Sequence, residues 1–331
     1  PDRLDGTDNQ TLRRFRAPGK LLAKWHGRKR KVSAAAIYRY LPALAILLLA
    51  SSNSRSAQAA PDNAHTVPSN NTAKLPQKTN RKPLRILFLG NSLTAMSFMP
   101  WMVHEFVKAS GRPCDIEMLA FPGETLEGHY HTVKTKMALT SGNWDCIVLQ
   151  EASEIRLEPK RAALYGHLLT EAIKGKDLSR RAETPTKILF FEAFADKGQT
   201  KHQEEIRLTT EAICRQTGAT LVPVGELFAA NLKEKPALNP YMSDNHHPSA
   251  SGSYLAACAI YRAIMGARYK ALKSSLPSKI AYVCQANDPY IPATESGQAP
   301  PPGTSFTLVE LKKADAAYLQ NLAETQPKSQ F

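Results

Sequence analysis

Five short apolar runs, each followed by a segment with helical features, constrain the fold of this chain more than any other feature of its sequence. Runs of this length and composition are typical of strands that are buried on both faces of a sheet. No hairpin turn joins one run to the next, so we expect parallel strands with helical crossovers. The predicted strands cover residues 84–89, 114–120, 145–150, 187–194 and 220–224. The sequence therefore predicts the α/β class, with a flavodoxin-like, five-stranded parallel sheet in a three-layer α/β/α sandwich.

The segments between these runs contain helix start and stop signals. Pro100 suits the first turn of a helix, and Gly111 follows its end. Thr125 is a predicted N-cap, while Gly218 and Gly266 follow the ends of two later helices. The predicted helices cover residues 100–110, 125–139, 159–174, 199–217 and 249–265.

The first apolar run ends abruptly at Gly90-Asn91-Ser92. Glycine permits a tight turn at the carboxyl end of a strand, where open α/β sheets place their ligands. A serine just beyond such a turn has its hydroxyl free at the mouth of a crevice. Taken alone, this stretch is more often an ordinary turn with a surface serine, so a chemical role for Ser92 needs a second signal.

That signal is the stretch 243–249, SDNHHPS. A serine hydroxyl is a poor nucleophile near neutral pH and needs a neighbouring base. An aspartate three residues before a histidine, on a loop that precedes a helix, can orient the imidazole and set its tautomer. Asp244 and His247 have this spacing. We therefore predict a catalytic triad in which Ser92 is the nucleophile, His247 the base and Asp244 the acid.

At this pairing the chain resembles the SGNH (GDSL-type) hydrolase superfamily, in its carbohydrate-esterase-like branch. In that superfamily a strand ends in a G-[DN]-S-[LF] block with the nucleophile, and a D-x-x-H-P block near the C-terminus supplies the acid and the base. Here the blocks read GNSLT and DNHHPS, and the resemblance covers roughly residues 84–266. It implies an SGNH hydrolase fold and an esterase that acts through a serine.

The resemblance also implies an oxyanion hole. Its donors would include the backbone N–H groups of Ser92 and of Gly123, which follows a predicted strand in the stretch FPGET. A simple Pro-Gly turn is an equally good interpretation of Gly123. Many members carry G-x-N-D after the third strand, where this chain has Gln150 instead. The Gln150 amide is either a third donor or a hydrogen-bond partner of a neighbouring loop.

The expected substrate is an acyl ester, with acetyl as one candidate acyl group and a carbohydrate as the favoured alcohol. The export signal described below, the lack of a long apolar lid and the resemblance favour a sugar ester. Lipid and aryl esters are the alternatives. Asn91, His129 and Glu151 lie near the motif blocks and are weaker candidates for contacts with the substrate. Neither a metal nor another cofactor is expected.

Two other functions fit parts of the sequence. A metal-dependent hydrolase would use His129, His131, Asp244 and His247 as ligands. This hypothesis is weaker, because two histidines at H-x-H spacing on a helix point to different faces. A non-catalytic carbohydrate-binding protein on the same fold is the third hypothesis, and the intact Ser92 with its acid and base argues against it.

The positive charge of the chain is concentrated at its N-terminus. The formal net charge is +14, and residues 1–59 hold 12 of the 43 Lys and Arg residues but only 3 of the 29 Asp and Glu residues. The remainder is only mildly basic, which argues against a nucleic-acid partner. The basic residues precede the apolar run 41–50, LPALAILLLA, and the pattern Ala57-Gln58-Ala59, which together predict an export signal. The alternative is a membrane anchor at 41–50, although this run is short for a stable span.

Three regions are therefore expected: a signal peptide over 1–59, a flexible linker over 60–82 and an exported hydrolase domain over 83–331, periplasmic or extracellular. The linker is rich in Pro, Asn, Thr, Lys and Gln and has too few apolar residues to fold. Near the C-terminus, Thr307 and Glu310 form a capping-box pattern that predicts a helix to about residue 324, within a docking segment over 304–324. Its predicted apolar face consists of Leu308, Leu311, Ala314, Tyr318 and Leu322.

The five cysteines are an odd number, so at least one thiol is unpaired within the chain. Cys146 and Cys258 lie inside apolar runs and are expected to be small buried hydrophobic residues. No C-x-x-C spacing indicates zinc binding or redox chemistry.

Overall fold

A computed structural model describes residues 82–153, 158–180, 182–266, 272–278 and 306–325. The predicted signal peptide and nearly all of the predicted linker lie outside the described residues, as does Cys284. All described residues belong to one unit of the chain, Ala73–Phe331.

The centre of this unit is a five-stranded parallel sheet with the strand order β2-β1-β3-β4-β5. Its strands are β1 Leu84–Gly90, β2 Cys114–Ala120, β3 Cys146–Gln150, β4 Lys187–Phe191 and β5 Thr220–Val222. The predicted class, strand number and strand direction are confirmed. The fourth and fifth strands are shorter than predicted, because residues 192–194 and 223–224 leave the ladder while remaining mostly buried.

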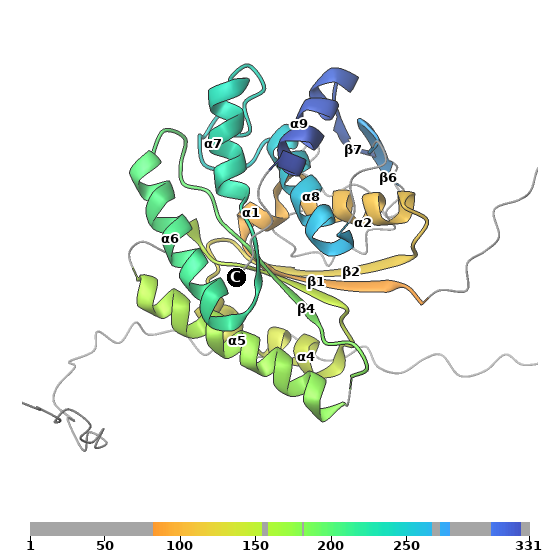
Figure 1. Ribbon diagram of the computed structural model, residues 1–331, viewed down its shortest axis with the longest axis vertical. Coiled ribbons are helices and arrows are strands. Elements are labelled where there is room, and N and C mark those ends of the chain that lie inside the picture. Colours follow the sequence, from red (N-terminus) through yellow and green to blue (C-terminus); the bar gives the residue numbers. More distant parts are fainter. Residues whose placement is uncertain (1–81, 154–157, 181, 267–271, 279–305, 326–331) are drawn as a thin grey trace, which may run out of the picture. The chain divides into compact units, whose positions relative to one another are not determined.

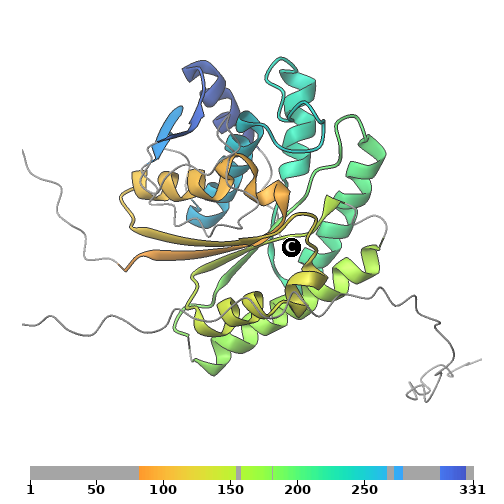
Figure 2. The same ribbon diagram turned by 180° about the vertical axis from the view of Figure 1, so that it is seen from behind.

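Helices cover both faces of the sheet (Figures 1 and 2). On one face lie α2 Met99–Ala109 and α8 Ala250–Met265, joined by an edge-on contact of Phe106 and Tyr254 at 5.4 Å between ring centroids. On the other face lie α4 Val133–Ser141 and α5 Pro159–Ser179. Four consecutive residues of β1, Ile86 to Leu89, are fully buried, because each face of the strand meets a layer of helices.

Two further helices follow β4 and β5 in the chain, and the first of them contacts α5. Helix α6, Thr200–Thr217, ends at Gly218, whose φ of 72° is the left-handed conformation that glycine adopts readily. Helix α7, Val224–Glu234, lies in a segment for which the sequence analysis predicted no helix.

The prediction of a single helix over 125–139 is wrong, because the helix is interrupted at Thr132. Two helices replace it, α3 Leu126–His131 and α4, and Thr132 between them has an extended backbone. The hydroxyl of Thr132 donates to the Gly128 carbonyl at 2.7 Å, a local side-chain bond that competes with continuation of the helix. Thr125 is the N-cap of α3, as predicted, and its hydroxyl accepts from the Gly128 N–H at 3.1 Å.

The capping-box prediction at Thr307 and Glu310 is also wrong. Both residues lie in strand β7, Phe306–Glu310, which pairs antiparallel with β6, Ser275–Ser278. The strand's backbone groups are satisfied by β6, so the helix begins later, as α9 Lys313–Thr325. Helix α9 contacts α8. Of the predicted apolar face, Leu322 is buried on α9 and Leu308 is buried on β7. The other buried residues of α9 differ from the predicted ones: Ala316, Leu319, Gln320 and Ala323.

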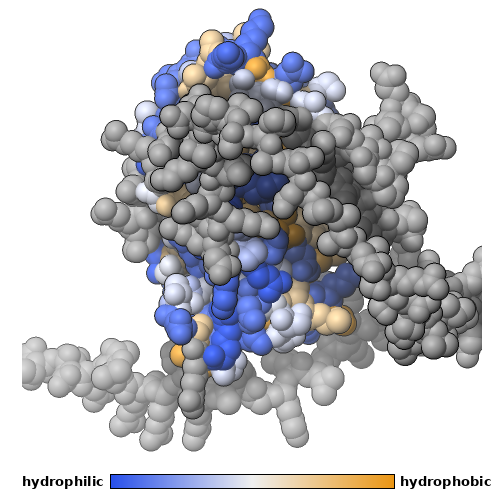
Figure 3. All heavy atoms as spheres, turned by 90° about the vertical axis from the view of Figure 1, so that its right-hand side faces the viewer, coloured by the Kyte–Doolittle hydropathy of each residue, from blue (hydrophilic) through white to orange (hydrophobic). Residues whose placement is uncertain are grey.

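Among the described residues, Cys114, Cys146, Cys214 and Cys258 are buried, and no disulfide joins any two of them. On the face shown in Figure 3, hydrophilic residues predominate wherever the grey atoms leave the surface visible. Among the described residues, no helix combines the length and the hydrophobicity that crossing a membrane requires.

Candidate active site

The turn after β1 is built around Gly90. A Cβ atom on this residue would lie 2.4 Å from the Thr94 hydroxyl oxygen and 2.6 Å from Gln150 Oε1. Glycine is therefore required here by the close approach of two polar side chains. The turn leads directly into a short helix, α1 Ser92–Ala95, followed by the 3₁₀ turn η2 Met96–Phe98.

Asn91 caps α1 and ties it to the loop after β2. Its Oδ1 accepts from the Leu93 N–H at 3.0 Å, and its Nδ2 donates to the Glu124 carbonyl at 3.0 Å. Only 3% of the residue is exposed. Because both ends of its amide are used internally, the structure does not place Asn91 as a contact for substrate.

Ser92 is the first residue of α1 and is half-buried. Within the described residues, neither its hydroxyl nor its backbone N–H has a hydrogen-bond partner. The hydroxyl is therefore free to react, and the N–H is free to donate to a ligand.

Gln150, at the end of β3, forms hydrogen bonds with this turn. Its Oε1 accepts from the Asn91 N–H at 3.0 Å and from the Thr94 hydroxyl at 2.8 Å, while its Nε2 donates to the Glu151 carbonyl. The side chain is fully buried. Of the two roles that the sequence left open, this geometry favours the bond to a neighbouring loop over that of an oxyanion donor.

The loop that carries Asp244 and His247 is closed by local hydrogen bonds. One carboxylate oxygen of Asp244 accepts from the backbone N–H groups of His246 and His247, at 3.0 and 2.9 Å. The other lies 2.7 Å from Nδ1 of His247. These bonds, led by the one to the His247 ring, lower the pKa of Asp244 to about 2. An ionised Asp244 requires a proton on Nδ1 of His247, which leaves a lone pair on Nε2.

His246 turns the other way and pairs with Asp196, a residue of the loop after β4. Its Nδ1 lies 2.6 Å from Asp196 Oδ1, and its ring meets the His247 ring edge-on at 4.6 Å between centroids. The backbone N–H of Lys197 also donates to the Asn245 carbonyl at 2.9 Å. The loop that carries His247 is thus anchored to the end of β4.

Two contacts bring this loop and the start of α8 next to the segment that follows Ser92. The Ser97 hydroxyl donates to the carbonyl of Pro248, the residue after His247, at 3.2 Å. The Ser253 hydroxyl donates to the Met96 carbonyl, also at 3.2 Å. Within the described residues no hydrogen bond joins Ser92 directly to His247, and the contacts between the two segments are those of their neighbours.

Gly123 lies in the turn after β2, the strand beside β1, and Gly90 is in register with Ala120 at the ends of the two strands. The turn is closed by a bond from the Glu124 N–H to the Phe121 carbonyl at 3.1 Å. Gly123 is exposed, has a φ of +64° and, among the described residues, its N–H has no acceptor. The neighbouring turns after β1 and β2 thus each present a free backbone donor.

His129 and Glu151, two weaker candidates for substrate contacts, face the interior. His129 is fully buried, with Nε2 2.8 Å from the Gly90 carbonyl and Nδ1 3.1 Å from the Thr135 hydroxyl. Burial lowers its pKa, so the ring is neutral: Nε2–H donates to the carbonyl and Nδ1 accepts from Thr135. Glu151 is 5% exposed and accepts from the backbone N–H groups of Leu126 and Ala152. Both residues support the two turns from within.

The alternative set of metal ligands is not assembled. Both ring nitrogens of His129 are used internally, and His131 Nε2 lies 3.4 Å from the Tyr165 hydroxyl. Asp244 and His247 are paired with each other. In the part of the chain that the structure describes, no three His, Cys, Asp or Glu residues are grouped closely enough to hold a metal ion.

Asp196 is the site residue that the sequence analysis did not identify. It lies five residues after the end of β4, at the same edge of the sheet as Ser92. A polar residue at the carboxyl edge of a parallel sheet is a signal that could have drawn attention to it.

Comparison with known proteins found similarity at the level of three-dimensional structure only. No protein-family model matches the chain, and no curated protein matches its sequence. One similar solved structure is described as an SGNH hydrolase from Slackia heliotrinireducens, with 25% identity, a TM-score of 0.47 and coverage of 55% of this chain and 98% of that chain. A DUF4886 family protein from Bacteroides uniformis has 16% identity and a TM-score of 0.46, over 74% of this chain and 96% of that chain. An acetylxylan esterase from Geobacillus stearothermophilus has 17% identity and a TM-score of 0.41, over 55% and 94% of the respective chains.

Proposed function

We propose that this chain is a serine ester hydrolase in which Ser92 is the nucleophile, His247 the general base and Asp244 the residue that orients the base. The observation that carries the proposal is the 2.7 Å contact of Asp244 with His247, on a loop whose next residue contacts the segment after Ser92. A free serine hydroxyl, a correctly protonated imidazole and an ionised carboxylate are the three groups that acyl transfer to serine requires.

In this proposal the resting His247 imidazole is ready to accept a proton. Asp244 holds the proton of His247 on Nδ1, so Nε2 accepts the proton of the Ser92 hydroxyl as its oxygen attacks the acyl carbon. The bond to the alcohol then breaks, and the imidazolium returns the proton to the leaving alcohol. Water repeats the sequence on the acyl-enzyme and releases the acid.

Negative charge forms on the former carbonyl oxygen during each step. Fixed donors that point at this oxygen lower the barrier, typically by a few kcal/mol for each donor. We assign this role to the backbone N–H groups of Ser92 and Gly123. Gln150 supports the turn of Ser92 in this proposal and does not contact the oxyanion.

The finer assignment is an exported enzyme that hydrolyses an ester of a carbohydrate, with acetyl as the candidate acyl group. The export signal proposed from residues 41–59 supports the location. A sugar ester is favoured because the sequence contains no long apolar lid of the kind that shields a lipid chain.

Ser92→Ala tests the nucleophile. Its kcat for p-nitrophenyl acetate is expected to fall by about 10⁴–10⁶-fold, because the remaining binding groups alone supply only a residual rate. The melting temperature should stay within a few degrees of the wild-type value, since the hydroxyl has no partner among the described residues. A mutant that retains a substantial part of kcat would show that Ser92 is not the nucleophile.

Two adjacent histidines provide a matched pair of variants for the base. His247→Asn should lose about as much kcat as Ser92→Ala, whereas His246→Asn should lose far less, because its ring pairs with Asp196. A larger loss from His246→Asn would contradict the assignment.

A further inference from the structure

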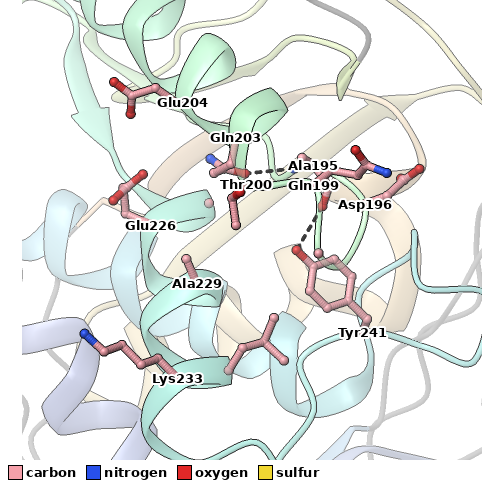
Figure 4. A pocket seen from close by; sticks show the side chains of 13 residues that line it. Ala195, Asp196, Gln199, Thr200, Gln203, Glu204, Glu226, Ala229, Lys233 and Tyr241 are labelled. Atoms are coloured by element: carbon pink, nitrogen blue, oxygen red, sulfur yellow. Dashed lines mark hydrogen bonds between the residues drawn. The ribbon is translucent and has the colours of Figure 1, made fainter.

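A pocket of about 430 Å³ lies between α6, α7 and the loop after β4 (Figure 4). Its volume is within the range of small-molecule sites, roughly 300–1,000 Å³. Ala195 comes from the loop after β4, Tyr241 from the loop before α8, Gln203 from α6, and Ala229 and Leu232 from α7. None of these residues has a role in the acyl-transfer chemistry described above.

The pocket adjoins the loop that carries the proposed base. Tyr241 forms a backbone bridge with Pro248, the residue after His247, and its hydroxyl donates to the Ala195 carbonyl at 2.9 Å. Asp196 also lines the pocket, and its carboxylate is the partner of His246. A molecule in this pocket therefore lies against the residues that hold His247 in place.

Hydrogen bonds of Gln203 connect α6 to the end of β4 at one wall of the pocket. Gln203 Oε1 accepts from the Ala195 N–H at 2.8 Å, and its Nε2 donates to Glu192 at 2.7 Å. Gly225 makes room for this side chain, since a Cβ there would lie 1.9 Å from Gln203 Nε2. Burial raises the pKa of Glu192, the acceptor of the bond from Gln203, well above its ordinary value.

The charge of the lining disfavours anionic ligands. Asp196, Glu204 and Glu226 contribute three carboxylates and Lys233 one ammonium, and Glu204 is also paired with Arg207 on the same helix. The lining is acidic overall, which disfavours phosphates, carboxylates and nucleic acids. An uncharged ligand, or a weakly cationic one, is compatible with it.

The remaining lining combines small apolar groups with amides and a hydroxyl. Ala229 and Leu232 offer most of the apolar surface, since Ala195 and Tyr241 are only 2% and 7% exposed, and Gln199 and Thr200 contribute polar groups. Sugar rings carry C–H groups on their faces and hydroxyls on their edges, which is the same combination. A fatty acyl chain would leave these polar groups unpaired.

We propose that the α6–α7 pocket is a subsite for a neutral sugar ring, belonging to the alcohol part of the ester. The proposal rests on the proposed function, because it identifies the substrate class of that same site. It assigns α6, α7 and Tyr241 to recognition of the alcohol, at a distance from the groups that react.

Ala229→Trp tests the subsite by filling it. Ala229 is exposed on α7, so the larger side chain extends into the pocket without entering the core. Ala212→Trp is the matched control, because Ala212 is exposed on α6 and is not part of the lining. Ala229→Gln is a milder second variant, and thermal unfolding of each protein establishes that it is folded.

Two measurements separate the subsite from the catalysis. Calorimetric titration of the wild type with xylobiose and cellobiose should detect binding at millimolar concentration or better, weakened at least 10-fold by Ala229→Trp and unchanged by Ala212→Trp. The ratio of kcat/KM for acetylated xylobiose to kcat/KM for p-nitrophenyl acetate should also fall at least 10-fold in Ala229→Trp.

The outcomes of the two proposals are distinguishable. Hydrolysis of p-nitrophenyl acetate without any sugar binding would overturn the subsite and leave the esterase proposal intact. Sugar binding that depends on Ala229, in a protein that hydrolyses neither ester, would overturn the esterase and, with it, the assignment of the sugar to an ester, while supporting the pocket as a sugar site. Binding of spermidine in place of both sugars would show that the pocket selects cations, which also overturns the subsite.

Discussion

At the scale of single residues, the carboxamide of Gln150 is the main polar support of the turn that carries Ser92. It satisfies the Asn91 N–H and the Thr94 hydroxyl, two groups that have little access to water. A buried donor that loses its acceptor costs about 1–3 kcal/mol. The position of the nucleophile therefore depends on a side chain that does not contact substrate.

Gln150→Ala is expected to lower the melting temperature while the folded enzyme keeps kcat within about 10-fold of the wild type. The reason is the loss of both hydrogen bonds and the creation of a small cavity. Thr94→Val, which removes one of the two bonds from the other side, should reproduce part of the same loss of stability. A Gln150→Ala enzyme with a normal melting temperature and a kcat lowered by about 10²–10³-fold would instead reveal an oxyanion donor.

At the scale of secondary-structure elements, Glu151 connects the end of β3 with the start of α3. Its carboxylate accepts from the Leu126 N–H, at 3.3 Å, and from the Ala152 N–H, at 2.7 Å. Burial raises its pKa to about 7, and the two backbone bonds only partly oppose this effect. The turn that contains Gly123 is therefore attached to the sheet through a group that titrates near neutral pH.

We expect Glu151 to make the folded protein less stable as the pH rises from about 4.5 to about 7. In this window the folded state holds a proton that the unfolded chain releases, so a rising pH favours unfolding, by on the order of 3 kcal/mol in total. Urea unfolding at pH 5 and pH 8 measures the change. Glu151→Gln should remove this contribution. The stability of the variant relative to the wild type should therefore be higher at pH 8 than at pH 5.

Glu183→Gln is the matched control for this titration, since Glu183 is exposed. The control should follow the pH dependence of the wild type. If Glu151→Gln also follows it, the ionisation of Glu151 does not contribute to stability in this range.

At the scale of the whole molecule, the described fold begins at residue 82, and the basic N-terminal segment precedes it. We propose that residues 1–59 direct export and are removed. The mature N-terminus is then expected near Ala60, because Ala57-Gln58-Ala59 has the small-residue pattern of a cleavage site. Intact mass spectrometry of protein from the exported fraction measures the N-terminus. Retention of residues 41–50 would indicate a membrane anchor in place of a signal peptide.

Features that depend on neighbours in the chain could be predicted from the sequence alone. The five apolar runs predicted the parallel sheet, and Thr125 and Gly218 predicted helix ends, because periodicity and caps act within a few residues. The contact of Asp244 with His247 belongs to the same class. Three residues of separation on one loop allow the two side chains to meet through local backbone geometry.

Only the tertiary structure decided the contacts between distant segments. Gln150 is 59 residues from Asn91, and Asp196 is 50 residues from His246. The strand β7, which sequence signals assigned to a helix, exists because β6 satisfies its backbone groups. These contacts and this strand depend on which surfaces pack together, and local conformational propensity is too weak to determine them. The sequence by itself therefore determined the sheet and the pair of Asp244 and His247, whereas packing determined what holds Ser92 in place and where the α6–α7 pocket lies.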